Sequence, residues 1–284
     1  MEKKLTVNDI HFEKGEASYS NPRFVNQLHL GEVVPGVIPQ VVVPDTKIDK
    51  AWGEQFEAGY DVYPVEKVHG FQWADLLRKK EIYKDGRVLH FSGQDHIEVA
   101  IKTLQQMREL VENYGILLID RNILNILIKL VPHESKPSSW SYQVMQVDLG
   151  AVKDLVNKTP YIDKSINLKE RKGTINTQEL LSNNSEFAHN ICVVVETLHT
   201  LATTDPYQND ISTDVKKELR NFYEQWDVMG FSRKGNDYIS FNELEKFLKK
   251  LLTLQIKFEE SPYTNLLSSM KKMWQGLRAR MLPH

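Results

Sequence analysis

Three polar residues interrupt the most aliphatic part of the sequence at a spacing that suits phosphate chemistry. Asp120 and Asn125 lie five residues apart within the stretch from Leu118 to Ile128, and Asp148 opens an Asp-Leu-Gly turn after the next apolar run. A carboxylate base near further carboxylate and amide oxygens is what a site for Mg²⁺ and a nucleotide requires. The residue types and their spacing therefore predict such a site. The alternative is that these residues only cap or begin turns.

The order of these residues resembles the catalytic core of protein kinases, in which an Asp is followed five residues later by a metal-binding Asn and then by Asp-Phe-Gly. The stretch from Val65 to Gly70 resembles the kinase hinge, whose backbone groups hold the adenine edge of ATP. The resemblance implies that the backbone at Glu66 and Val68 binds this nucleotide. It extends over residues 10 to 254 of the chain.

The same resemblance implies a role for each residue of the central site. Asp120 would accept the proton of the attacking hydroxyl group, while Asn125 and Asp148 would hold Mg²⁺ ions that bridge the phosphates of ATP. Catalysis would then consist mainly of positioning and charge neutralisation. The implied cofactors are ATP and Mg²⁺, and the implied partners are a nucleotide and a protein substrate or partner.

The sequence departs from the kinase pattern before the hinge and before the catalytic Asp. No Gly-x-Gly-x-x-Gly occurs anywhere, and Leu118-Ile119 stands where kinases have His-Arg. The stretch from Phe12 to Ala17 resembles the helix whose Glu pairs with a strand Lys near the phosphates. This implies Glu16 and the upstream Lys4 as further nucleotide-binding residues.

Elements that must position these residues follow from periodicity and from turn residues. Apolar residues recur every three or four positions after Asp95, which predicts a helix that Asp95 caps and Gly115 ends. The stretch from Lys129 to Trp140 has the residues of a hairpin tip, and residues 151–185 read as a surface loop. The sequence also predicts helices over 12–30 (interrupted at 21–22), 187–201, 215–226, 241–252 and 263–281, and strands over 41–43, 60–63, 116–119, 126–130 and 143–147. The kinase resemblance implies a further helix over 73–77, after the hinge.

Together these elements predict an α+β protein, and the kinase resemblance implies the two-lobed kinase-like fold. Residues 1–65 would form a partial, β-rich N-terminal lobe. Residues 66–254 would form a mainly helical C-terminal lobe, with the hinge at 65–70. Residues 255–284 would form a C-terminal helical extension. The small lobe would then lack one hairpin, the one that carries the glycine-rich loop of kinases.

Composition excludes several other classes of protein. The 284 residues include 36 basic and 38 acidic ones, which gives a net charge of −2. The charge of the whole chain therefore does not favour binding to nucleic acid. One cysteine, Cys192, excludes a disulfide framework. No apolar window is long enough for a transmembrane segment, and the N-terminus lacks a signal-peptide pattern. We therefore expect a cytoplasmic protein without nucleic-acid partners, and no feature predicts an oligomer.

Three functions remain open from the sequence. The first is a phosphotransferase that moves the γ-phosphoryl group of ATP to a Ser or Thr hydroxyl. The second is a catalytically impaired pseudokinase or truncated kinase that acts as a binding module, because the glycine-rich loop is missing and Leu118-Ile119 precedes the catalytic Asp. The third is a small-molecule kinase of the aminoglycoside or choline type, which shares the Asp-x4-Asn loop.

Overall fold

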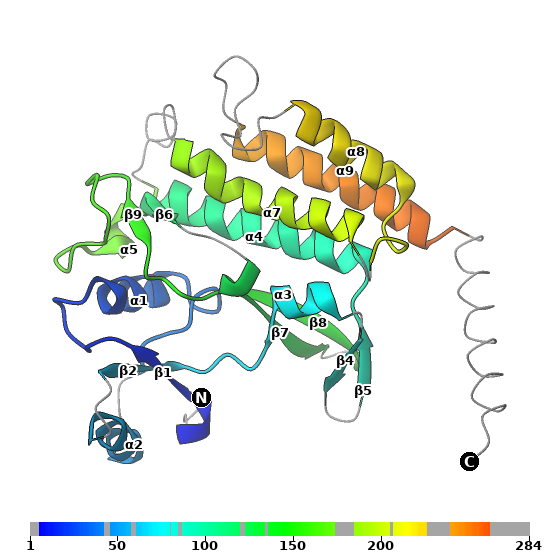
Figure 1. Cartoon of the computed structure of the whole chain (residues 1–284). Coiled ribbons are helices and arrows are strands. Elements are labelled where there is room, and N and C mark those ends of the chain that lie inside the picture. Colours follow the sequence, from blue (N-terminus) through cyan, green and yellow to red (C-terminus); the bar gives the residue numbers. More distant parts are fainter. Residues whose placement is uncertain are drawn as a thin grey trace, which may run out of the picture.

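The computed structural model of the chain describes residues 6–42, 46–57, 61–79, 81–84, 87–119, 123–133, 136–173, 185–204, 207–225 and 239–261. Within these residues helices predominate and strands form sheets of two or three members. The predicted mixed α+β class is confirmed. Figure 1 shows a layer of long helices above smaller groups of strands and helices.

The long helices form one layer at the top of Figure 1. They are α4 (Gly93–Tyr114), α7 (Ser185–Thr203), α8 (Thr213–Gln225) and α9 (Phe241–Glu259). α4 packs against both α7 and α9, and α8 packs against the same two helices. The largest apolar cluster lies among these four helices and the strands beneath them. None of the described helices is both long and apolar enough to cross a bilayer.

α4 begins and ends through local interactions that the sequence indicates. The Ser92 side chain accepts a hydrogen bond from the Asp95 amide, and the Asp95 carboxylate accepts one from the Ser92 amide at 2.7 Å. Gly115 closes the helix in the left-handed conformation with φ of 66°. The predicted helix is confirmed, although Ser92 rather than Asp95 is the N-cap, since Asp95 occupies the third position of a capping box.

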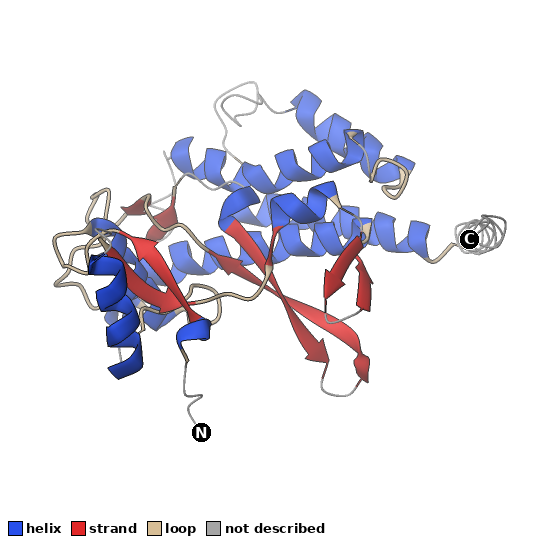
Figure 2. Ribbon diagram, turned by 60° about the horizontal axis from the view of Figure 1, so that its bottom comes forward, coloured by secondary structure: helices blue, strands red, loops and turns tan. Residues whose placement is uncertain are grey.

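The described strands pair in the antiparallel sense, as Figure 2 shows for the central hairpin and its neighbours. The pairs are β1 (Ile10–Lys14) with β2 (Val62–Glu66), β3 (Phe71–Gln72) with β7 (Ile126–His133) and β7 with β8 (Lys136–Gln146), β4 (Glu81–Lys84) with β5 (Arg87–His90), and β6 (Ile116–Leu118) with β9 (Val152–Asp154). The predicted hairpin around Lys129 to Trp140 is confirmed as β7–β8. Its register sets Ile126 opposite Gln146 at the open end.

Several shorter elements complete the description. They are η1 (Val7–Asp9), α1 (Pro22–Val33), α2 (Thr46–Glu57), α3 (Trp73–Arg78), η2 (Ile123–Asn125) and α5 (Leu168–Arg171). α3 matches the helix predicted after the hinge. The predicted loop over 151–185 is wrong where it contains β9 and α5. The predicted terminal helix over 263–281 lies outside the described residues.

The first 65 residues differ most from the prediction. The helix expected over 12–30 is wrong in its first half, because β1 is a strand that pairs with β2. The helix begins only at Pro22, where the Asn21 side chain caps the Arg23 amide and proline fits the first turn. α2 was not predicted, and Val41 forms only an isolated bridge with Val65. The described part of this region is therefore more helical than β-rich.

A second apolar cluster joins this N-terminal region to the helical layer. It includes Leu30, Val34 and Ile38 from α1 and the turn after it, together with Tyr114 and Leu149 from the middle of the chain. The amide of Gln146 donates to the Val37 carbonyl at 2.7 Å and adds a backbone link. Residues on both sides of position 65 therefore share one core. The predicted domain limits at 65 and 254 stay a prediction.

His96 lies buried among aromatic rings at the start of α4. Its Nδ1 accepts a hydrogen bond from the indole Nε1 of Trp73 at 2.9 Å, and the rings of Phe91 and Tyr207 meet it edge-on. The second nitrogen, Nε2, therefore carries the proton and has no partner among the described residues. Burial lowers the pKa of His96 to about 3.

This buried histidine predicts a pH dependence of stability. In the unfolded chain the imidazole takes up a proton near pH 6.5, whereas in the fold it stays neutral down to about pH 3. Its contribution is therefore present above about pH 6.5 and is lost as the pH falls below that value. We expect His96→Gln to lose less free energy of unfolding than the wild type between about pH 7 and about pH 5, measured by urea denaturation. An unchanged pH slope in the variant would contradict the assignment.

Candidate functional site

The two predicted metal ligands lie at the open end of the β7–β8 hairpin. Asn125 ends η2 directly before β7, and Asp148 follows β8 by two residues. The Val147 amide donates a hydrogen bond to the Asn125 carbonyl oxygen at 2.9 Å. The Asn125 side chain is buried, whereas 49% of the Asp148 side chain is exposed. The fold therefore brings these two predicted residues onto neighbouring segments.

The β6–β9 pair also ends near the Asp148 turn. The Ile119 amide donates to the Ala151 carbonyl oxygen at 2.9 Å, and Leu118 pairs with Val152. Asp120 follows Ile119 directly in the sequence but lies outside the described residues. Its predicted role as a base stays a prediction.

The Asp148 carboxylate is bound by a cation from the N-terminal region. Arg23, in the first turn of α1, places Nη2 at 2.8 Å from Asp148 Oδ1. The backbone of Asp148 is left-handed with φ of 54°, a conformation that aspartate adopts more readily than most residues. A Cβ on Gly150 would lie 2.7 Å from Arg23 Nη2. The glycine of the Asp-Leu-Gly turn therefore leaves room for the guanidinium group.

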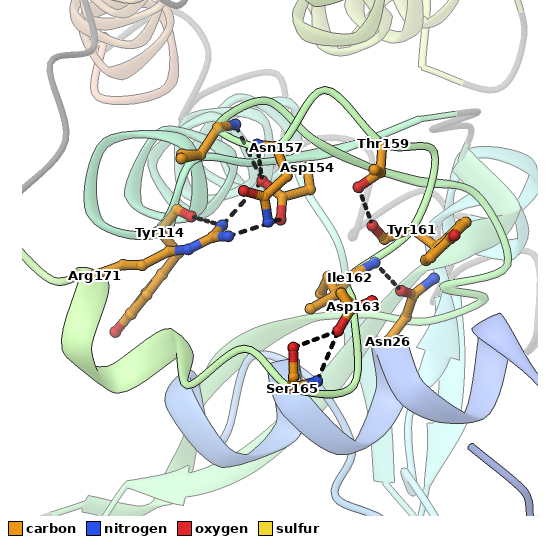
Figure 3. Close-up of polar contacts among 11 residues, drawn as sticks. Asn26, Tyr114, Asp154, Asn157, Thr159, Tyr161, Ile162, Asp163, Ser165 and Arg171 are labelled. Carbon is orange, nitrogen blue, oxygen red and sulfur yellow. Dashed lines mark hydrogen bonds and ion pairs between the residues drawn. The ribbon is translucent and has the colours of Figure 1, made fainter. Parts of the chain in front are cut away.

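Asn26, one helical turn after Arg23, binds α1 to the same turn. Its Nδ2 donates to the Leu149 carbonyl oxygen at 3.1 Å, and its Oδ1 accepts from the Ile162 amide at 3.1 Å. The side chain is fully buried, and Figure 3 shows it reaching from α1 to Ile162. Both ends of the amide are used. Asn26 therefore fixes α1 against the Asp-Leu-Gly turn and against the segment after β9.

A buried ion pair between Asp154 and Arg171 connects the two ends of the segment after β9 (Figure 3). The Arg171 guanidinium contacts both carboxylate oxygens of Asp154, at 2.9 and 2.8 Å, and also donates to the Tyr114 carbonyl oxygen at 3.2 Å. Asp154 is fully buried and accepts further hydrogen bonds from Val156 and Asn157. The ends of the segment are thereby held together at the C-terminal end of α4.

A buried tyrosine lies beside the Arg23–Asp148 pair. Tyr63, in β2, is fully buried and packs edge-on against Phe24 with 5.2 Å between ring centroids. Its hydroxyl has no hydrogen-bond partner among the described residues. Burial raises the pKa of this hydroxyl, and the neighbouring charges of Glu13, Arg23 and Asp148 modify it further. The hydroxyl therefore keeps its proton.

The predicted hinge connects β2 to β3. The Glu66 amide donates to Gln40 at 2.8 Å and the Lys67 amide to Asp9 at 2.7 Å, so both amides are already used. The backbone of Val68 makes no hydrogen bond with any other described residue. A Cβ on Gly70 would lie 2.6 Å from the Ile128 carbonyl oxygen, so glycine lets the hinge pass close to β7. Of the two predicted hinge residues, only Val68 has an amide available for a ligand.

Glu16, another predicted nucleotide-binding residue, does not join this group. Glu16 lies in the turn between β1 and α1, so the helical position expected for it is wrong. It is exposed, its carbonyl oxygen accepts a hydrogen bond from Asn21, and its carboxylate makes no ion pair with another described residue. The physical reason is that Asn21-Pro22 starts the helix after Glu16. Lys4 lies outside the described residues.

The described residues do not fit a magnesium site as they are arranged. Mg²⁺ prefers six oxygen ligands in near-octahedral geometry. The described part of the chain holds no group of three or more His, Cys, Asp or Glu side chains that could bind a metal ion. Asp148, the carboxylate that the described residues bring to this turn, has an oxygen already bound by Arg23. A divalent cation and the guanidinium group would compete for it.

Comparison with known proteins adds little to this description. No protein-family model matches the chain, and no curated protein matches it. Among solved structures the chain is similar to the crystal structure of "Rad53 kinase domain and SCD2", with 14% sequence identity, coverage of 82% of this chain and 74% of that chain, and a TM-score of 0.36. At this TM-score and identity the likeness does not establish a shared fold, so the site is interpreted from its own contacts.

Three residues of the site were missed by reasoning from the sequence. Arg23 and Asn26 are spaced by three positions after the Asn21-Pro22 helix start, so their placement on one face of α1 was recognisable. No local pattern could show that this face meets a turn more than a hundred residues later. Tyr63 belongs to an apolar strand and has no signal of its own.

The buried Asp154–Arg171 pair predicts that removal of Arg171 destabilises the protein more than removal of the nearby Lys169. Arg171→Leu leaves a buried carboxylate without its counterion, and we expect it to lower the free energy of unfolding by about 3 kcal/mol. Lys169→Leu on the same helix breaks only the exposed contact with Glu32 at 3.5 Å, and we expect a loss below about 1 kcal/mol. Urea denaturation of both variants measures the difference. Equal losses would show that the pair does not hold the segment.

Proposed function

We propose that this chain is a kinase-like protein that binds ATP beside the Asp148 turn. The proposal rests chiefly on the hydrogen bond from the Val147 amide to the Asn125 carbonyl. This bond holds the segment of Asn125 beside the segment of Asp148, two residues that the kinase resemblance assigns to one site. The antiparallel pairs β6–β9 and β7–β8 support it, because they bring the ends of four strands to one place.

Groups that suit both parts of the nucleotide are present on β2, the hinge and α1. The Val68 backbone offers one donor and one acceptor, which suits the edge of an adenine base. Arg23 offers a guanidinium group, the side chain best suited to bind phosphate oxygens. The Tyr63 hydroxyl offers a further donor without a partner among the described residues. Binding would therefore use donors on β2, the hinge and α1.

We extend the proposal to phosphoryl transfer to a Ser or Thr hydroxyl. In this step the hydroxyl oxygen forms a bond to the γ-phosphorus, and the bond from that phosphorus to the β,γ-bridging oxygen breaks. Asp120 takes the hydroxyl proton, and ADP leaves with the electron pair of the broken bond. Asp120 follows Ile119 in the sequence, and the bond of the Ile119 amide to Ala151, three residues after Asp148, supports this role.

A second candidate is a protein that binds the nucleotide without transferring phosphate. The contact that favours it is the ion pair of Arg23 with Asp148, because this pair neutralises the carboxylate that the kinase resemblance assigns to a metal ion. The two candidates share the same binding site and differ only in turnover. They are therefore separated by activity and not by affinity for ATP.

The role of the hinge backbone can be tested with one substitution and a matched control. Val68→Pro removes the Val68 amide, which no other described residue uses, and we expect it to weaken ATP binding by about tenfold or more. Val68→Ala keeps the amide and should bind as the wild type does. Isothermal titration with ATP measures both, after unfolding temperatures without nucleotide have confirmed that each variant is folded. Equal affinity in the two variants would exclude the hinge as the adenine site.

Turnover can be tested at the predicted base. If the chain transfers phosphate, Asp120→Asn should lower the rate by about 10²- to 10⁴-fold while ATP affinity changes little. The measurement is transfer of labelled phosphate to a Ser/Thr peptide library, with Asn122→Ala as a neighbouring control. Transfer that survives Asp120→Asn would exclude this base. Absence of transfer by the wild type, with ATP bound, would select the second candidate.

A further inference from the structure

We propose that Arg23 is the resident cation of the Asp148 site and that ATP binds there without a divalent metal ion. This inference rests on the nucleotide site proposed above and goes beyond it by replacing the expected Mg²⁺ with a side chain. Its starting point is the mismatch between the donor groups present and the needs of a magnesium ion.

The contact between Arg23 and Asp148 shows how Arg23 would take the place of Mg²⁺. The distance of 2.8 Å between Nη2 and Asp148 Oδ1 is that of a charge-assisted hydrogen bond, so one carboxylate oxygen is already bound. A metal ion at the same oxygen would have to displace the guanidinium group. Gly150 makes the approach possible, since a side chain there would meet Arg23 at 2.7 Å.

The surrounding structure holds Arg23 in position before any ligand arrives. Asn21 caps the first turn of α1, and the buried Asn26 amide fixes the helix to Leu149 and Ile162. The guanidinium group therefore does not have to be ordered when a ligand binds, which lowers the cost of binding. A long side chain on a loosely held segment would not have this advantage.

The charges at the site agree with a role in binding phosphate. Asp148 alone would repel a nucleotide, and Arg23 cancels that charge at contact distance. A guanidinium group has five N–H donors, so binding Asp148 leaves donors for phosphate oxygens. The Tyr63 hydroxyl, fully buried and without a partner among the described residues, adds a neutral donor beside the pair.

The first experiment compares ATP affinity with excess EDTA and with excess Mg²⁺ by isothermal titration. We expect the wild type to bind equally well in both conditions. Arg23→Gln should lose about tenfold or more in EDTA and recover part of this loss in Mg²⁺. Arg78→Gln, which removes an exposed arginine of α3, is the matched control and should behave as the wild type. A wild type that binds ATP only with Mg²⁺ would overturn the proposal.

The second experiment needs no nucleotide and uses Mn²⁺ as the probe, with bound ion measured by electron paramagnetic resonance. We expect the wild type to bind no Mn²⁺, and Asp148→Asn, the matched control, to behave in the same way. An Mn²⁺ ion that the wild type binds and Asp148→Asn loses would overturn the proposal. If ATP binds in neither condition of the first experiment, the proposed function fails, and the Mn²⁺ measurement alone decides whether the Asp148 site takes a metal ion.

Discussion

The buried amide of Asn26 is the interaction on which the arrangement of the site depends. It is fully buried, and it donates to Leu149 with one end while it accepts from Ile162 with the other. A buried amide that lost either partner would keep an unsatisfied polar group, which costs about 1–3 kcal/mol. The same amide thus holds three segments together, and one helical turn earlier Arg23 meets Asp148 as a result.

The two ion pairs near the site differ in what they can contribute. Asp154 and Arg171 are 0% and 13% exposed, so this pair acts in a water-poor environment and holds the segment after β9. Arg23 and Asp148 are 36% and 49% exposed, and a pair of this kind contributes less than about 1 kcal/mol to stability. Folding alone therefore gives little reason for the second pair. In the proposed function this pair contributes to ligand binding and not to stability.

Local patterns in the sequence were sufficient for the elements that local interactions determine. α4 follows from its apolar period and its capping residues, and the β7–β8 hairpin follows from two apolar runs around a polar tip. The hairpin also brings Asn125 and Asp148 onto neighbouring segments. β1 could not be identified in this way, because Ile10–Lys14 becomes a strand only by pairing with Val62–Glu66, some fifty residues later. The contact of Arg23 with Asp148 spans 125 residues and has no local signature.

The most direct test of this account is the exchange rate of the Ile162 amide proton, measured by hydrogen–deuterium exchange with NMR detection. The Ile162 amide lies outside the regular elements and its hydrogen bond is made to the Asn26 side chain, so its protection reports the position of α1. We predict slow exchange in the wild type and a rate near that of the neighbouring Lys164 amide in Asn26→Ala. Fast exchange in the wild type, or protection that persists in Asn26→Ala, would contradict the account.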